Sequence, residues 1–256
     1  MWIDLHTHLN QEPLYKNWRE VYEKAKRSGV EGLIVVGFDF ESSKIAVEIS
    51  SRENNIFASV GIHPHDADSI NYSDLSWENL ITSKTIAIGE IGLDYYKMYS
   101  LKEKQIEIFR EGINFAKKYN LPLIIHCRDA YQDLVKILKE ERAWELKGIM
   151  HSYSGSYEIA KVIADWGFLF SFSGPITYPN AHRLREVVSK LPIDLIVIET
   201  DCPYLPPQSH RGETNEPSYL IEIAEKLSEI KNIPLEELEI KIQENIKKIF
   251  PKFFEI

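Results

Sequence analysis

Short apolar runs alternate with longer amphipathic segments along this chain of 256 residues. The runs are rich in Ile, Val, Leu and Phe, as is typical of buried strands. They predict strands over residues 2–5, 32–36, 56–62, 85–91, 123–125, 148–151, 168–172 and 195–199. Between them, apolar residues recur about one helical turn apart. These segments predict helices over residues 17–28, 41–53, 66–81 (after a loop), 100–119, 129–141, 156–165, 180–190, 217–228 and 234–250.

The alternation of strands and helices predicts a parallel sheet, because parallel strands need a crossover connection between them. Closing that sheet into a barrel removes its exposed edges. The length fits one (β/α)8 barrel. We therefore expect an α/β protein with a single domain over residues 1–256, a TIM barrel with an extra C-terminal helix.

Composition limits where the protein acts. The hydrophobic fraction of 44% is ample for a core, but no apolar stretch approaches the ~20 residues that span a bilayer. No charged segment followed by an apolar one begins the chain, so we expect no signal peptide. Two cysteines, Cys127 and Cys202, make no disulfide framework. We expect a cytoplasmic protein that does not associate with membranes.

The formal net charge of -9 argues against broad binding to duplex nucleic acid, which needs a basic face. It leaves room for a polyanionic substrate that meets a metal and a few local cations. The net charge therefore does not exclude a nucleic acid as substrate, but it indicates that few cations of the protein would contact it.

Metal-binding residue types follow the predicted strands. They are His6, His8, Glu90, His126, His151 and Asp201. Side chains alternate along a strand, so His6 and His8 point the same way and could share an ion. The carboxyl ends of parallel strands are where a TIM barrel carries its chemistry. One such histidine would be read as a hydrogen-bonded polar group at a strand end, but six residues so placed predict a metal site.

Six sequence blocks carry a resemblance to a known family. They span residues 3–9, 60–65, 88–96, 125–130, 151–155 and 199–204. In this order they resemble the TatD-family metal-dependent hydrolases, amidohydrolase-like TIM barrels known as deoxyribonucleases. The resemblance covers essentially the full chain and implies a metal-dependent nuclease.

The resemblance divides the six residues between two divalent ions, Zn, Mn, Mg or similar. It implies one ion held by His6, His8, Glu90 and Asp201. It implies a second held by Glu90, His126 and His151, so that Glu90 bridges the pair. Such ions lower the pKa of a water molecule and clamp the oxygens of a phosphodiester during its displacement.

Catalytic roles follow from the same resemblance. Asp201 would accept the proton of the attacking water, and Glu90 would act as the bridging carboxylate. His63 faces the active site in the family, which implies contact with the substrate phosphate or leaving group; a structural role for His63 is the alternative. We expect His65 and Asp66 to take part in a turn or helix cap.

Cations and tyrosines in the predicted loops are candidates for substrate contact. The cations are Arg128, His182, Arg183 and Arg211. The tyrosines are Tyr95, Tyr96 and Tyr153. A guanidinium binds phosphate through two hydrogen bonds, so Arg128 is a substrate-binding candidate. Tyr153 is another, because its ring could stack on a base or sugar; packing of the barrel mouth is equally consistent with the sequence.

Strand alternation also makes predictions about the neighbours of these residues. It turns Cys127 and Cys202 away from the metals. It turns Glu199 to the side of Asp201, where it could orient a metal-bound group or form a buried ion pair. At Glu213 and Thr214 the family usually has a basic pair, and its absence should weaken contact with a long polyanion.

Together these observations predict a deoxyribonuclease that acts on single-stranded DNA ends, with no obligate protein partner. The first alternative is an amidohydrolase-like enzyme that cleaves an amide, ester or lactone of a small molecule. The second is a non-catalytic metal-binding scaffold. A barrel hosts many chemistries, so the fold cannot separate the first two.

Overall fold

A computed structural model describes residues 1–255 and shows one eight-stranded sheet. Its strands are all parallel and follow chain order. They are β1 (Trp2–Thr7), β2 (Val30–Val36), β3 (Ile56–Val60), β4 (Thr85–Asp94), β5 (Leu123–Arg128), β6 (Gly148–Met150), β7 (Phe168–Phe172) and β8 (Ile196–Ile198). A bridge between Thr7 and Cys202 brings the last strand's end back to β1. The predicted TIM barrel is therefore confirmed.

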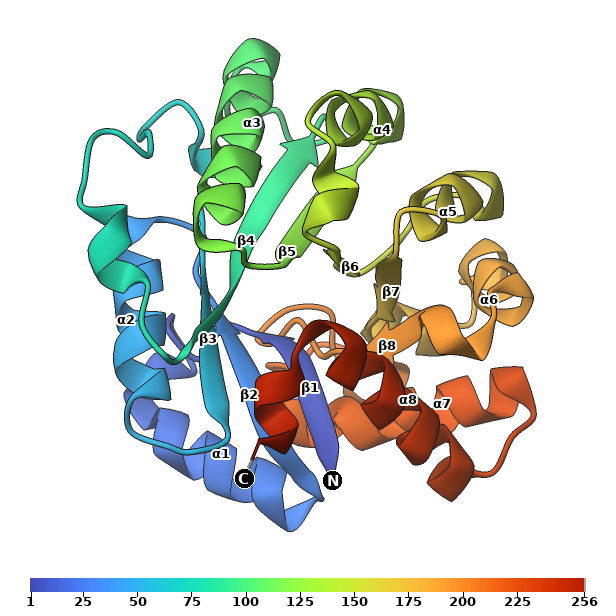
Figure 1. The fold of residues 1–256 in the computed structure, drawn as a ribbon. Helices are drawn as coiled ribbons and strands as arrows, with labels where there is room; N and C mark the ends of the chain where they lie inside the picture. The colour runs from blue at the N-terminus through green and yellow to red at the C-terminus, as the bar shows by residue number, and fades with distance from the viewer. Residues whose placement is uncertain (256) are drawn as a thin grey trace.

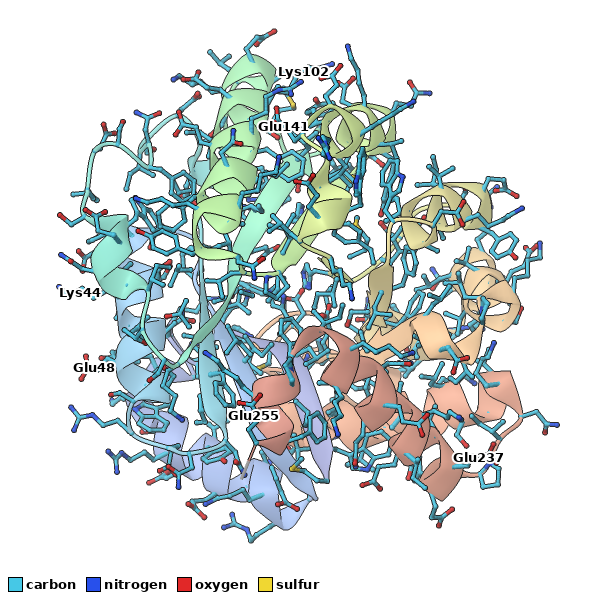
Figure 2. The ribbon with its side chains drawn as sticks, in the orientation of Figure 1. Lys44, Glu48, Lys102, Glu141, Glu237 and Glu255 are labelled. Atoms are coloured by element: carbon cyan, nitrogen blue, oxygen red, sulfur yellow. The ribbon has the colours of Figure 1, made fainter. Side chains whose placement is uncertain are left out.

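Helices surround the strands on the outside (Figure 1). They are α1 (Trp18–Arg27), α2 (Phe40–Ser50), α3 (Lys102–Tyr119), α4 (Tyr131–Glu140), α5 (Tyr157–Ala164), α6 (His182–Lys190), α7 (Leu220–Lys231) and α8 (Leu235–Ile249). Charged side chains such as Lys44, Lys102 and Glu237 point outward from this layer (Figure 2). No helix within residues 1–255 is both long and apolar enough to cross a membrane.

The helix predicted within residues 66–81 is wrong. Only two 3-10 turns, Pro64–Asp66 and Trp77–Leu80, lie between β3 and β4. The carboxylate of Asp74 accepts from both the backbone and the side chain of Asn71, and such local bonds compete with a helix. Trp77, which supplied much of the apolar pattern, is fully buried instead.

The extra C-terminal helix, α8, is confirmed and packs beside β8 and β1. The side-chain amide of Asn245 donates to the carbonyls of Ile193 and Ile196 at 2.8 Å each. The amino group of Met1 pairs with Glu239, also on α8. Met1 and Ile193 precede β1 and β8, and Ile196 is the first residue of β8. Helix α8 therefore braces the amino ends of these strands and leaves the carboxyl ends open.

Candidate metal centre at the carboxyl ends of the strands

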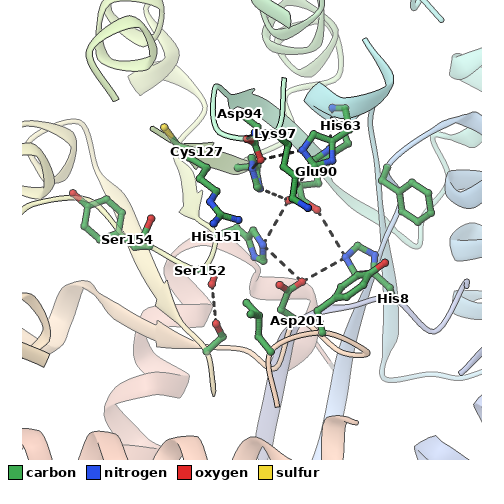
Figure 3. A pocket seen from close by; sticks show the side chains of 18 of the residues that line it. His8, His63, Glu90, Asp94, Lys97, Cys127, His151, Ser152, Ser154 and Asp201 are labelled. Atoms are coloured by element: carbon green, nitrogen blue, oxygen red, sulfur yellow. Dashed lines mark hydrogen bonds and ion pairs between the residues drawn. The ribbon is translucent and has the colours of Figure 1, made fainter. Parts of the chain in front are cut away.

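The six predicted metal ligands meet at the carboxyl ends of the strands. His6, Glu90 and His126 belong to β1, β4 and β5, His8 and His151 directly follow β1 and β6, and Asp201 lies three residues after the end of β8. A cavity of about 770 Å³ opens there, and all of the six except His6 line it (Figure 3). His6 is fully buried behind them. The structure therefore joins residues that are up to 195 positions apart in the chain.

One group of donor atoms surrounds a single carboxylate oxygen of Glu90. Oε2 of Glu90 lies 3.2 Å from Nε2 of His6, which lies 3.2 Å from Nε2 of His8. Oδ1 of Asp201 lies 3.6 Å from Nε2 of His8. Donors about 2.1 Å from a tetrahedral ion are themselves about 3.4 Å apart, so this spacing fits a Zn-type ion.

A second group surrounds the other oxygen of Glu90. Oε1 lies 2.9 Å from Nδ1 of His126 and 3.6 Å from Nε2 of His151. Nε2 of His63 lies 3.5 Å from the same oxygen. The two oxygens of one carboxylate thus face two different sets of nitrogen atoms.

Three histidines have an acceptor beside their outer nitrogen, and in a neutral ring an N–H on that side leaves a lone pair on the inner nitrogen that can bind a cation. Nδ1 of His8 lies 3.0 Å from the carbonyl oxygen of Val36, which can only accept a hydrogen bond. Nε2 of His126 lies 3.0 Å from Oδ2 of Asp94, and Nδ1 of His151 lies 2.6 Å from Oε1 of Glu199. An orienting acceptor behind each ring is the usual arrangement of metal-binding histidines. The donor set therefore fits divalent ions.

His63 differs from these three histidines in the group that it turns toward the cavity. Its Nδ1 accepts a hydrogen bond from the backbone N–H of His65 at 3.1 Å, so the proton of the neutral ring is on Nε2. Burial lowers the pKa of His63 to about 4, which keeps the ring neutral. His63 therefore presents an N–H to the cavity, where the other histidines present lone pairs.

Asp94, at the end of β4, is a site residue that the sequence analysis missed. Its Oδ2 accepts hydrogen bonds from Nε2 of His126 and Nε2 of His65, each at 3.0 Å. Burial alone would raise the pKa of Asp94, but these bonds and the backbone N–H of Lys97 hold it far below its usual range. Alternation along β4 could have revealed Asp94, because it lies four residues after Glu90 on the same face.

His65 and Asp66 lie in the turn Pro64–Asp66, as expected. The side chain of His65 has a further contact, with Asp94. The turn is short and directs the ring back across the barrel mouth, next to His126. The residue that caps this turn is His63, whose ring accepts from the backbone of His65.

Glu199 lies where alternation predicted it, as the partner of a candidate ligand. Its Oε1 is 2.6 Å from Nδ1 of His151 and accepts a hydrogen bond from the backbone of Ser152 at 2.7 Å. Burial alone would lower the pKa of His151, but Glu199, Glu90 and Asp201 raise it to about 10. This excess of buried negative charge favours cations in the cavity.

Asp201 is held in an unusual backbone conformation. Its φ of 60° lies in the left-handed region, which costs a residue with a side chain about 1 kcal/mol or more. The backbone N–H of Asp201 donates to the carbonyl of His6 at 2.9 Å. Burial raises the pKa of Asp201, but the charges of His151 and the histidines of β1 bring it below its usual value. The strain is thus offset by contacts that point the carboxylate into the site.

Asp4 supports the segment that carries Asp201. The sequence analysis also missed this residue, because it lies inside an apolar run. Its carboxylate accepts from the backbone N–H of Thr200 at 2.9 Å and from the Thr200 hydroxyl at 2.5 Å. Complete burial raises the pKa of Asp4 to about 8. Asp4 therefore ties β1 to the segment that carries Asp201.

Two of the three predicted substrate-binding side chains, Arg128 and Tyr153, differ in their surroundings. Arg128 is exposed at the cavity rim, and its guanidinium lies 3.8 Å from the ring centre of Tyr96. Tyr153 lines the cavity but is almost fully buried against Phe170, and its hydroxyl donates to the carbonyl of Ser156 at 2.7 Å. Tyr153 thus forms part of the wall, whereas Arg128 is free to meet a ligand.

Other candidates from the loops do not line the cavity. They are His182, Arg183, Arg211, Glu213 and Thr214. Arg211 stacks on Tyr178, with 4.4 Å between the guanidinium carbon and the ring centre. Glu213 lies 2.7 Å from His210. The missing basic pair at 213–214 therefore lies outside the cavity.

Neither cysteine joins a candidate metal group in the described part of the chain. Both thiols are buried, and burial raises the pKa of each above its usual value. We therefore expect Cys127→Ala and Cys202→Ala to retain the metal content of the wild type, which elemental analysis measures. A lost ion in either variant would show that a thiolate is a ligand.

The fold and the site together define the class of this protein: a TIM barrel with a candidate metal centre of histidines and carboxylates at the carboxyl ends of its strands. The sequence profile of the TatD-related DNases matches residues 3–251. The chain belongs to this TatD family of metal-dependent hydrolases.

Individual relatives support this assignment over the full length. The uncharacterized metal-dependent hydrolase YabD of Bacillus subtilis is 44% identical over 98% of this chain and 99% of its own. The crystal structure of YjjV, a TatD homologue from Escherichia coli, has a TM-score of 0.91, 27% identity and 98% coverage of both chains. A TatD-family hydrolase from Entamoeba histolytica has a TM-score of 0.86, 28% identity and the same coverage.

Proposed function

We propose that this protein hydrolyses phosphodiester bonds at single-stranded DNA ends with two divalent ions. The observation that carries the proposal is the position of Glu90, whose two oxygens face separate donor groups at 3.2 Å and 2.9 Å. Paired sites that share a carboxylate suit phosphodiester hydrolysis, because two ions can activate a water molecule and stabilise both the attacking and the leaving oxygen.

The protein's own residues would supply binding and proton transfer. The carboxylate of Asp201 lines the cavity and can accept the proton of a water molecule beside it. The N–H on Nε2 of His63 can donate to a phosphate oxygen or to the leaving oxygen. The carboxylates of Asp94 and Glu199 hold the rings of His126 and His151 in place during this chemistry.

Assays on small substrates test the reaction class. We expect metal-dependent release of p-nitrophenol from bis-p-nitrophenyl phosphate, and little turnover of matched p-nitrophenyl acetate and p-nitroanilide substrates. Single-stranded, duplex and abasic oligonucleotides with several divalent ions would then define the natural substrate. Preference for the ester, the amide or a lactone over the phosphodiester would favour the amidohydrolase-like alternative.

Removing the partner of His151 should weaken metal binding. In Glu199→Gln the amide no longer holds the ring by charge, so we expect affinity for one ion to fall about 10- to 100-fold, as for other partners behind metal-bound histidines. Titration of the protein with the metal ion in a calorimeter measures this loss of affinity. The exposed Glu225→Gln removes the same charge and should bind metal normally. Equal affinity in the two variants would show that Glu199 is only a structural ion pair.

A further inference from the structure

Two cations at the cavity rim have no carboxylate partner. Lys97 and Arg128 both line the cavity, and neither forms an ion pair within residues 1–255. By contrast, His210, which does not line the cavity, is paired with Glu213 and Glu222 at 2.7 Å and 2.8 Å. In a protein of net charge -9, unpaired cations beside a candidate catalytic cavity indicate that an anion binds between them.

An exposed aromatic surface adjoins these cations. Tyr99 lines the same cavity and is 64% exposed, with its ring held edge-on by His65 at 4.8 Å between ring centres. Nζ of Lys97 lies 3.4 Å from the Tyr99 hydroxyl. The guanidinium of Arg128, which also lines the cavity, lies over the ring of Tyr96. A large apolar ring that stays exposed next to cations suits a ligand with both a flat ring and a negative charge.

The loop after β4, which carries Tyr96, Lys97 and Tyr99, is preformed. The carboxylate of Asp94 accepts from the backbone N–H groups of Tyr96 at 3.0 Å and Lys97 at 2.9 Å. The buried side chain of Gln105 donates to the carbonyls of Asp94 and Ser100, at 3.0 Å each, and so pins both ends of the loop. Binding of a ligand would therefore not include the free-energy cost of ordering this loop.

We propose that Lys97, Tyr99 and Arg128, which we call the rim subsite, bind the nucleotide next to the scissile phosphate of a single-stranded nucleic acid. Lys97 and Arg128 bind its phosphate groups, and Tyr99 stacks on its base. The inference rests on the proposed function and names the residues that select a chain of nucleotides over a lone phosphodiester. Paired bases cannot reach Tyr99 without unstacking, so the subsite favours single strands.

Salt dependence of binding tests the two cations. The probe is a fluorescein-labelled phosphorothioate oligothymidylate bound to the metal-loaded enzyme, with fluorescence anisotropy read at several salt concentrations. Because each phosphate contact on a single strand contributes about -0.7 to the log–log slope, we expect Lys97→Gln and Arg128→Gln each to reduce its magnitude by about 0.7. Arg183→Gln, an equal charge change outside the cavity, should leave the slope unaltered. Equal slopes in all of these proteins would overturn the role of the cations.

An abasic probe tests the stacking surface. We expect Tyr99→Ala to weaken binding of the oligothymidylate about tenfold, within the range of one base stacked on an aromatic ring, and Tyr99→Phe to bind as the wild type does. An oligonucleotide that lacks the base next to its labelled end should bind Tyr99→Ala and wild type equally. If Tyr99→Ala weakened both probes alike, the ring would act through the loop and not through a base.

The outcome separates the rim subsite from the proposed function. If the wild type hydrolyses neither bis-p-nitrophenyl phosphate nor oligonucleotides with any divalent ion, the proposed function is wrong. If it hydrolyses both, and the rim variants bind oligonucleotides with wild-type affinity and slope, the rim subsite alone is wrong. Circular dichroism of each variant checks folding, which exposed side chains should not perturb.

Discussion

Glu90→Gln should lose at least one metal ion and reduce turnover of bis-p-nitrophenyl phosphate about a thousandfold, the effect of removing a principal electrostatic group from an active site. The reason is the position of Glu90 between two donor groups, 3.2 Å from His6 and 2.9 Å from His126. A neutral amide offers only one oxygen acceptor and no charge, so it cannot serve both groups. Elemental analysis and steady-state kinetics on the purified variant measure the two losses.

An exposed glutamate provides the control for this substitution. Glu78→Gln removes one negative charge from the surface of the turn before β4 and should change neither metal content nor turnover. Two tightly bound ions in Glu90→Gln, with turnover close to that of the wild type, would contradict the dinuclear proposal. A single retained ion would be consistent with loss of the bridge.

Asp201→Asn should lower kcat about 10²- to 10⁴-fold, the usual contribution of a positioned general base. The substitution keeps the shape of the side chain but removes the charge and the proton-accepting ability of the group 3.6 Å from His8. Metal binding to the group around His126 should persist, because Asp201 lies outside it. Single-turnover kinetics at saturating metal separates lost chemistry from lost metal.

The matched control for Asp201→Asn is Asp165→Asn, at the exposed C-terminal end of α5. It should retain wild-type kcat. If Asp201→Asn turned over normally with its full metal content, another group in the cavity would have to accept the proton. The general-base assignment would then be wrong.

Much of the fold could be predicted from local patterns. The apolar runs of a parallel sheet are buried on both faces, so they stand out from the amphipathic helices around them. The pattern failed at residues 66–81, where the apolar side chain of Trp77 serves the core from a 3-10 turn. Periodicity shows that a residue is buried but not always which backbone conformation buries it.

The candidate ligands were predictable for the same reason. In a parallel barrel all strands run the same way, so residues such as His6 and Glu90 that follow apolar runs reach one end together. Asp4 lies inside an apolar run, where a buried carboxylate has no local signature. Alternation places Asp94 on the face of Glu90, but nothing local shows what its carboxylate contacts. Their roles depend on Thr200 and His126, which are distant in sequence.

The sequence by itself therefore determined the barrel, the end of it that carries chemistry and the residue types that meet there, because strand period and chain direction are local properties. Only the tertiary structure decided which nitrogen of His8 and of His126 faces the cavity, since their partners Val36 and Asp94 lie on other strands. It also decided which cations can meet a substrate. Arg128 and Arg183 look alike in sequence, and only packing around the mouth leaves Arg128 on the rim and Arg183 outside it.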